Sequence, residues 1–227
     1  MPTGKLNKRT IRMMKKPRCG KPDINKTRRT RSTNGMCKRK VHVKKIFDRA
    51  LRIWSKAIPL KFYYVMKDPV INIRFASGDH GDNNPFDGKG NVLAHAFEPG
   101  EDHNISGDTH FDESEPWSVS EDSGINLLSV AIHELGHAIG LSHSSDINDV
   151  MAPFFDKIHH KLQPNDKRRA QAIYDDILWK CDVDNPSSVS KTEVPFHRKH
   201  GPPKAAVMIS NWGRKERLFL FGVSFQI

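Results

Sequence analysis

The most distinctive chemical pattern in the sequence is the segment HELGH, in which His133 and His137 lie four residues apart. On a helix such residues share one face, so both imidazoles would point at the same metal ion. Glu134 lies beside them, where a carboxylate can take the proton of a zinc-bound water. Gly140 can adopt a positive φ and end the helix, which lets His143 return as a third ligand. Three protein ligands leave a fourth position open, which is typical of catalytic zinc.

The apolar pattern predicts the elements that must position this motif. The strongest predicted helix covers residues 125–139 and carries the motif. Further helices are predicted over residues 5–16, 43–57 and 165–178, and strands over residues 60–66, 70–75, 92–97 and 218–221. Pro17 and Pro59 end the first two of these helices.

Residues 76–117 form a long segment rich in glycine, histidine and acidic residues, with little apolar periodicity. A loop of this length in a compact domain needs something other than a core to order it, and metals can do so. Donors suited to a closed tetrahedral zinc are His80, Asp82, His95 and His110. Hard oxygens for calcium come from Asp87, Asp112 and Glu115, joined by the backbone carbonyls of Gly88, Gly90 and Val92. The alternative is a flexible acidic loop with surface histidines.

Composition excludes several classes of protein. The chain has 227 residues, 37% of them hydrophobic, and a net charge of +11. It has no apolar run long enough for a transmembrane helix, no apolar signal segment, and three cysteines, which cannot form a closed disulfide framework. Residues 1–52 carry 19 Lys and Arg against two Asp. This basic arm is either a solvated, processed segment or a surface for nucleic acid or another polyanion.

The zinc motif extends into a longer pattern that resembles a known family. GINLLSVAIHELGHAIGLSHS followed by DVMAPFF resembles the matrix metalloproteinases, and GDHGDNNPFDGKGNVLAHAF with GDTHFDESEPW resembles their structural zinc and calcium region. The resemblance implies an α+β metzincin fold, with a mixed twisted sheet and three helices. It also implies that Met151 lies beneath the three histidines and that Pro153 lines the substrate pocket. Leu93 and Ala94 fall in the edge strand that would bind an extended substrate.

The segment PRCGKPD, residues 17–23, resembles the pro-peptide motif PRCGVPD of the same family, with Lys21 in place of Val. The resemblance implies that Cys19 binds the catalytic zinc as a thiolate and keeps the enzyme latent, while Arg18 pairs with Asp23. Residues 28–31, RRTR, fit a minimal site for a furin-like protease that would remove the switch.

The chain departs from the family pattern in three places. It begins inside the pro-domain. Only 19 residues separate Asp23 from Val43, so the first strand of the family's sheet is missing, which could expose a strand edge. Cys181 and AAVMISNWGRKERLFLFG resemble part of a hemopexin-like blade, which we expect to be disordered alone. The expected parts are residues 1–31 (end of the pro-domain), 32–178 (catalytic domain) and 179–227 (hinge and hemopexin-like fragment).

The resemblance therefore implies a secreted zinc endopeptidase of the extracellular matrix, holding two zinc ions and at least one calcium ion. Its expected partners are extended peptide segments of extracellular proteins and proteinaceous metalloproteinase inhibitors, without a specific nucleic acid or a membrane span. One alternative is an inactive relative, in which the missing strand or the retained Cys19 prevents turnover. Another is a polyanion-binding protein that acts through residues 1–52.

Overall fold

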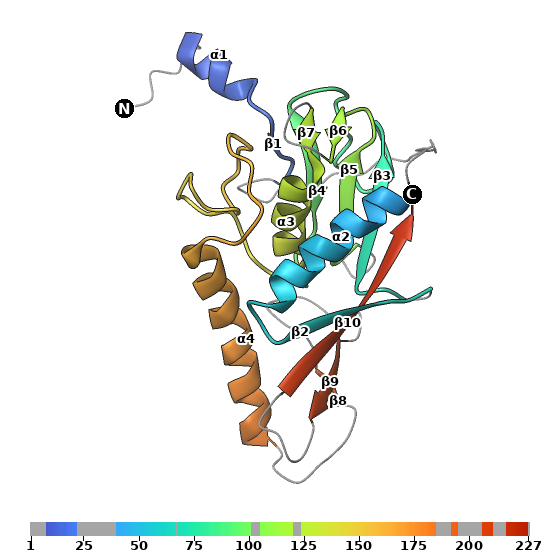
Figure 1. The fold of residues 1–227 in the computed structure, drawn as a ribbon, viewed down its shortest axis with the longest axis vertical. Helices are drawn as coiled ribbons and strands as arrows, with labels where there is room; N and C mark the ends of the chain where they lie inside the picture. Colours follow the sequence, from blue (N-terminus) through green and yellow to red (C-terminus); the bar gives the residue numbers. More distant parts are fainter. Residues whose placement is uncertain are drawn as a thin grey trace.

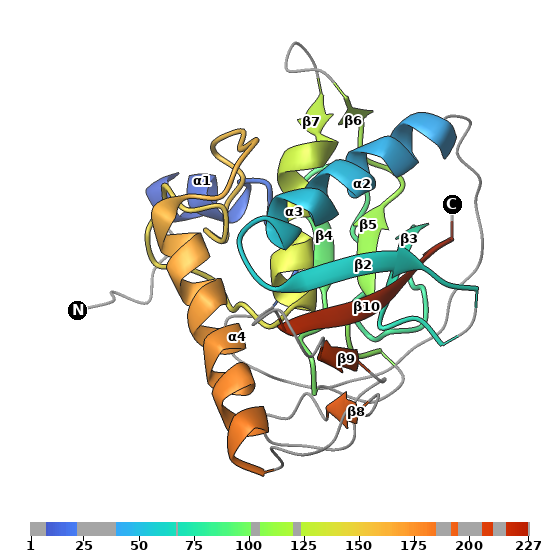
Figure 2. The ribbon, with the colours of Figure 1, turned by 60° about the horizontal axis from the view of Figure 1, so that its bottom comes forward.

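The computed structural model describes residues 8–21, 40–66, 68–100, 105–119, 124–184, 192–194, 206–210 and 217–226. Its helices are α1 (Lys8–Met14), α2 (Lys40–Ser55), α3 (Leu127–Ala138) and α4 (Pro164–Asp184). Its strands are β1 (Arg18–Cys19), β2 (Leu60–Tyr64), β3 (Ile71–Ala76), β4 (Val92–Ala96), β5 (Thr109–Asp112), β6 (Trp117–Ser118), β7 (Ile125–Asn126), β8 (Thr192–Val194), β9 (Ala206–Ser210) and β10 (Arg217–Gln226). Figures 1 and 2 show α2 and α3 side by side on one face of a twisted sheet, with α4 at one side. This is the α+β metzincin architecture that the resemblance implies.

The helices follow the predicted apolar periodicity. On α2, Phe47, Ala50 and Trp54 recur at three- and four-residue steps and are fully buried. The Trp54 indole Nε1 donates a hydrogen bond to the carbonyl of Ile132 on α3, 2.9 Å away. Because that bond joins the only polar atom of a buried tryptophan to the zinc-motif helix, it fixes how the two helices pack.

The main sheet is mixed, in the order β1-β4-β5-β3-β10-β9-β8, with β2 paired to β10. β3 and β5 are parallel, while β4 and β5 are antiparallel, with His95 directly opposite His110. The sheet face toward the helices buries Ile71, Ile73 and Phe111 against α2 and α3. The predicted strands over residues 60–66, 70–75 and 92–97 are confirmed as β2, β3 and β4, with bounds shifted by one or two residues.

The structure corrects the expectation for the end of the chain. The sequence predicts that the hemopexin-like fragment is disordered alone and that the missing first strand could expose a strand edge, and the prediction of disorder is wrong for residues 217–226. Instead, β10 pairs in parallel with both β2 and β3 and occupies the middle of the sheet. The predicted strand over residues 218–221 is real but longer, because it has two strands to pair with rather than a blade of its own.

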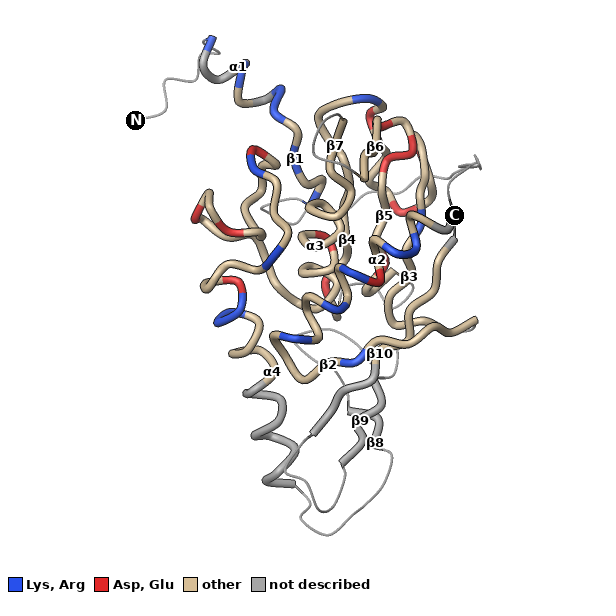
Figure 3. The backbone as a smooth tube through the Cα atoms, viewed as in Figure 1, with Lys and Arg blue, Asp and Glu red and all other residues tan. Residues whose placement is uncertain are grey.

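Charge is unevenly distributed over this fold. Basic residues follow α1 and α2, whereas acidic residues gather on the loops beside β5 and β6 (Figure 3). In the described part of the chain, every helix is too short or too polar to cross a membrane.

Candidate metal centres

Helix α3 presents the zinc motif from inside the core. Its first turn is capped by Asn126, whose side-chain oxygen accepts a hydrogen bond from the Ser129 amide at 3.0 Å. All of its residues are buried, and His133 and His137 point to the same side, with their Nε2 atoms 3.1 Å apart. The i and i+4 spacing therefore brings the two imidazoles together as predicted.

Backbone carbonyls fix which nitrogen of each ring is available. The Nδ1 of His133 donates to the carbonyl of Val150 at 2.7 Å, and the Nδ1 of His137 donates to the carbonyl of Leu141 at 2.6 Å. Burial lowers the pKa of His133 to about 3 and that of His137 well below its ordinary value, so both rings are neutral. Two unprotonated nitrogens facing each other at 3.1 Å repel unless a cation lies between them. The pair therefore fits a metal ion.

The chain brings His143 back to the same place through a turn at Gly140. Gly140 has a φ of 102°, which ends α3, and its amide donates to the carbonyl of His137 at 2.8 Å. The His143 ring then lies 4.7 Å from the ring of His137. Arg169 on α4 donates to the carbonyls of Ser142 and His143, which holds the returning segment against the helix.

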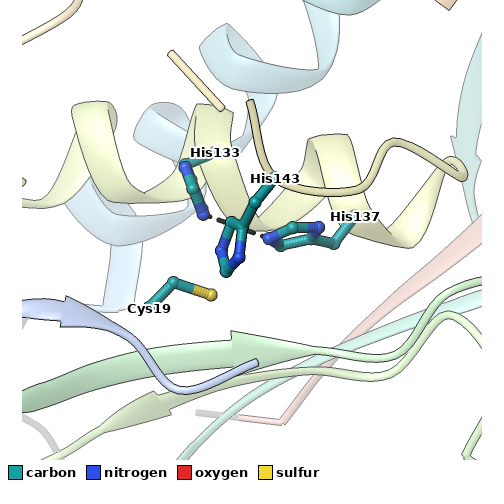
Figure 4. Close-up of side chains that lie close together, drawn as sticks. All are labelled: Cys19, His133, His137 and His143. Carbon is teal, nitrogen blue, oxygen red and sulfur yellow. Dashed lines mark hydrogen bonds between the residues drawn. The ribbon is translucent and has the colours of Figure 1, made fainter. Parts of the chain in front are cut away.

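The Cys19 sulfur completes this first group of donors. The donor atoms of Cys19, His133, His137 and His143, which we call the helix group, lie within 4.8 Å of one another (Figure 4). Burial raises the pKa of the Cys19 thiol well above its ordinary value, and the nearby Glu134 carboxylate raises it further. Only a cation in the group would hold this sulfur as a thiolate.

Backbone hydrogen bonds hold the segment around Cys19 on two sides. On one side, the Arg18 amide donates to the carbonyl of Asn91 at 2.8 Å and the Gly20 amide to that of Ala94 at 2.7 Å. On the other side, the Cys19 amide donates to the carbonyl of Pro153 at 3.2 Å. Strand β4, with its predicted substrate-binding residues, therefore lies on one side of the Cys19 strand, and Pro153 lies on the other side.

A salt bridge adds to this docking. The Lys21 ammonium lies 2.6 Å from the Glu98 carboxylate, just after β4, and Ser142 donates to the same carboxylate oxygen at 3.0 Å. Lys21 is the residue that departs from the family motif, and its partner Glu98 was not predicted. The expected pair of Arg18 and Asp23 lies outside the described residues, because Asp23 is not among them.

Glu134 is fully buried beside the helix group. Its Oε2 lies 3.5 Å from the Cys19 sulfur, and its Oε1 has no hydrogen-bond partner among the described residues. Burial raises the pKa of Glu134 to about 8, although the thiol and the Lys21 charge lower it. A buried carboxylate with a raised pKa and an unused oxygen is suited to accept a proton.

A second group of four donors lies on the loop after β3 and on strands β4 and β5, and we call it the loop group: His80, Asp82, His95 and His110. One oxygen of Asp82 lies 2.7, 2.7 and 2.6 Å from a ring nitrogen of each of the three histidines in turn. The facing ring nitrogens are 3.4 Å apart between His80 and His95 and 3.2 Å apart between His95 and His110. Ligands on a zinc ion at about 2.0 Å are separated by about 3.3 Å, so the group fits tetrahedral zinc.

The acidic residues predicted to bind calcium also come together. Burial raises the pKa of Glu115, and the Asp112 and Asp87 charges raise it further. One oxygen of Asp112 is buried without a hydrogen-bond partner among the described residues, while Glu115 accepts from the Gly90 amide at 2.5 Å. Gly88 and Gly90 have φ values of 83° and 93°, which bend the loop around these carboxylates. Gathered, partly unpaired carboxylates fit a hard cation.

Two residues support the helix group from below: Met151, which was predicted, and Asp166, which was not. Met151 is buried where a side chain at Gly136 would overlap its sulfur, which agrees with its expected place beneath the histidines. The buried Asp166 carboxylate accepts from the amides of Val150 and Met151 at 3.0 and 3.2 Å. The only signal for Asp166 in the sequence is an acidic residue near the start of a predicted helix.

Comparisons with known proteins agree with this geometry. The family model described as Matrixin (Peptidase_M10) matches residues 26–175. Matrilysin of Felis catus is 43% identical over 190 residues, which cover 76% of this chain and 72% of the relative. Matrilysin of Homo sapiens is 42% identical, with coverage of 76% and 70%. Macrophage metalloelastase of Rattus norvegicus is 38% identical over 208 residues, covering 84% of this chain and 44% of the relative.

Proposed function

The chain belongs to the matrixin family of zinc-dependent metalloendopeptidases, and we propose that His133, His137 and His143 hold its catalytic zinc. The observation that carries the assignment is the pair of neutral imidazole nitrogens facing each other at 3.1 Å beside an unpartnered carboxylate. Zinc bound there supplies a Lewis acid that polarises the scissile carbonyl and acidifies a water.

Glu134 is the proton carrier of the reaction. Its carboxylate takes the proton of the attacking water and passes it to the nitrogen of the leaving amine. Its position supports this role, because the buried carboxylate lies beside the helix group and its Oε1 has no hydrogen-bond partner among the described residues.

The substrate binds as an extended peptide along β4. Leu93 and Ala94 of this strand offer backbone groups to it, and Pro153 bounds the cleft on the far side. The hydrogen bonds of the Cys19 segment to Ala94 and Pro153 support this path, because a peptide in the same cleft would need the same backbone partners.

Latency follows from Cys19. A metal held by the three histidines and the Cys19 sulfur would have no position left for a catalytic water. Cleavage between the switch and the catalytic domain, at residues 28–31 or nearby, would release it. The cleavage site lies outside the described residues.

The loop group binds the second zinc, and the carboxylates of Asp87, Asp112 and Glu115, with the carbonyls of Gly88, Gly90 and Val92, bind calcium. These ions order a loop that has little apolar core of its own. The enzyme acts outside the cell on proteins of the extracellular matrix, and proteinaceous metalloproteinase inhibitors are its further expected partners.

The test is hydrolysis of a quenched peptide before and after removal of residues 1–31, with zinc measured by elemental analysis. His143→Ala should abolish hydrolysis and lower the affinity of the helix group for zinc. His42→Ala is the matched control, because His42 is exposed and lies in neither group. Full hydrolysis by the His143→Ala protein would refute the assignment.

A further inference from the structure

Strand β10 lies between β2 and β3, which follow each other in the sequence. Without β10, these two strands would be separated by a gap in the sheet. Val223 pairs with Tyr64 of β2 and also with Ile71 of β3, so β2 and β3 lie on opposite edges of β10. Among the described strands, β10 is the one to which β2 is hydrogen-bonded. Figures 1 and 2 show β10, in red, running beside β2 toward β3. In the described part of the chain, β2 therefore joins the sheet through β10.

The backbone just after β2 and just before β3 is also hydrogen-bonded to β10. The Val65 amide donates to the carbonyl of Val223 at 3.0 Å, and the Val70 amide donates to that of Gly222 at 2.8 Å. A Cβ at residue 222 would meet the Val65 side chain at 2.9 Å, so Val65 packs closely over β10 because residue 222 is glycine. These contacts are specific to one register of β10.

The buried face of β10 is part of the catalytic core. Phe221 and Val223 are each 1% exposed. Phe221 packs against Phe62 of β2 with ring centroids 6.0 Å apart, and Phe225 packs against Phe47 of α2 at 5.4 Å. Because α2 is bonded to α3 through the Trp54 indole, this packing reaches the helix that carries the zinc motif.

The sequence of β10 suits a central strand and not an exposed tail. Residues 218–226 carry no charge, and Phe219, Phe221, Val223 and Phe225 occupy alternate positions. An uncharged strand of this kind would promote aggregation if it were free, whereas a central position pairs both of its edges.

We propose that residues 217–226 are a donor strand that completes the catalytic sheet between β2 and β3. The slot between β2 and β3 is therefore a binding site for this segment of the same chain. The segment does not belong to a separate C-terminal unit, and the slot should accept it as a free peptide. Without it, the backbone groups of β2 and one edge of β3 lose their partners and the aromatic core opens.

The first experiment traps the register of β10. Asn72 and Ser224 are register partners, and their side chains are hydrogen-bonded at 2.9 Å. Asn72→Cys with Ser224→Cys, in a chain carrying Cys37→Ser and Cys181→Ser, should form an intramolecular cross-link with a short bis-maleimide. Each single cysteine is the control. A cross-link found only between two chains would overturn the proposal, because it would assign the strand to a second copy.

The second experiment uses the close approach at Gly222. Gly222→Ala should lower Tm by roughly 3 to 10 °C, and Val65→Ala in the same chain should restore part of that loss. Ser210→Ala is the control. If Gly222→Ala leaves Tm unchanged in both backgrounds, β10 does not lie in the slot.

The third experiment supplies the strand in trans. A chain ending at Asp184 should unfold at a lower temperature than the full chain, and a synthetic peptide of residues 217–226 with a solubilising lysine tag should raise its Tm. A scrambled peptide should not. If the shortened chain has the Tm of the full chain, the proposal is wrong. All three readouts are independent of peptide hydrolysis, so a wrong assignment of the catalytic residues would leave them unchanged.

Discussion

The helix group and the loop group each gather four donors, but they draw them from different parts of the chain. All donors of the loop group lie between His80 and His110, on strands and loops of one domain. In the helix group, three donors come from α3 and the turn after it, whereas Cys19 comes from a segment far earlier in the chain. Donor number alone does not separate a structural site from a catalytic one.

The two groups differ in whether a donor can leave the metal site. His95 and His110 are paired directly across β4 and β5, so the sheet itself holds the loop group closed. Cys19 is held by backbone hydrogen bonds to β4 and Pro153, which a peptide in the cleft could replace. We therefore expect the loop group to be permanent, and the helix group to have three fixed donors and one exchangeable donor.

The largest effect on activity is expected when the proton-carrying residue beside the helix group is replaced. In protein freed of its switch, Glu134→Ala should lower kcat by about 10³-fold, because no other group can carry the proton. Zinc content of both groups should stay unchanged, since Glu134 is not a donor in either. Measurement of kcat and zinc in the same preparation checks this, and equal hydrolysis by mutant and parent would contradict it.

Removing the exchangeable donor should come next. Cys19→Ser replaces a soft anionic ligand by a neutral hydroxyl, so the uncleaved chain should gain activity by at least roughly tenfold. Cys37→Ser is the control, because it should leave latency intact. If neither Cys19→Ser nor cleavage yields activity while both zincs are bound, the chain is an inactive relative.

Removal of a donor from the loop group should lower the stability of the fold. His95→Ala should reduce zinc from two ions to one per chain and lower Tm by roughly 10 °C, because the loop loses what orders it. Hydrolysis should persist at temperatures below the new Tm. A single zinc in the parent, unchanged by His95→Ala, would remove the loop group as a zinc site.

Chelation of calcium should loosen residues 76–117 first, and hydrogen exchange can measure this.

The smallest effect is expected at the salt bridge beside the switch. Lys21→Val removes the ion pair with Glu98 and should raise the residual activity of the uncleaved chain by about two- to fivefold. In the parent, added salt should mimic part of this change, whereas in the variant salt should have little effect. An identical response of parent and variant to salt would show that the pair does not hold the segment.

Local patterns made much of this structure predictable. The zinc helix needs only the i, i+4 spacing, an apolar face and Gly140 as a stop, and these are visible within a dozen residues. The residues of the loop group were predicted because they are zinc donors in a long segment with little apolar periodicity, and because this segment resembles the family's structural-metal region.

Contacts between distant segments were not predictable. The place of β10 depends on pairing with β2 and β3, which lie far earlier in the chain, and no short pattern encodes such pairing. Asp166 and Arg169 act on the helix group only because α4 packs beside it. The partner of Lys21 is likewise set by how the segment docks on β4.

Zinc K-edge X-ray absorption of the uncleaved chain tests the exchangeable donor most directly. With two zincs and one cysteine ligand, we predict an average of about half a sulfur per zinc at about 2.3 Å. The sulfur shell should disappear in Cys19→Ser and stay in Cys37→Ser. A first shell of nitrogen and oxygen alone in the parent, or a sulfur shell that survives Cys19→Ser, would contradict the account.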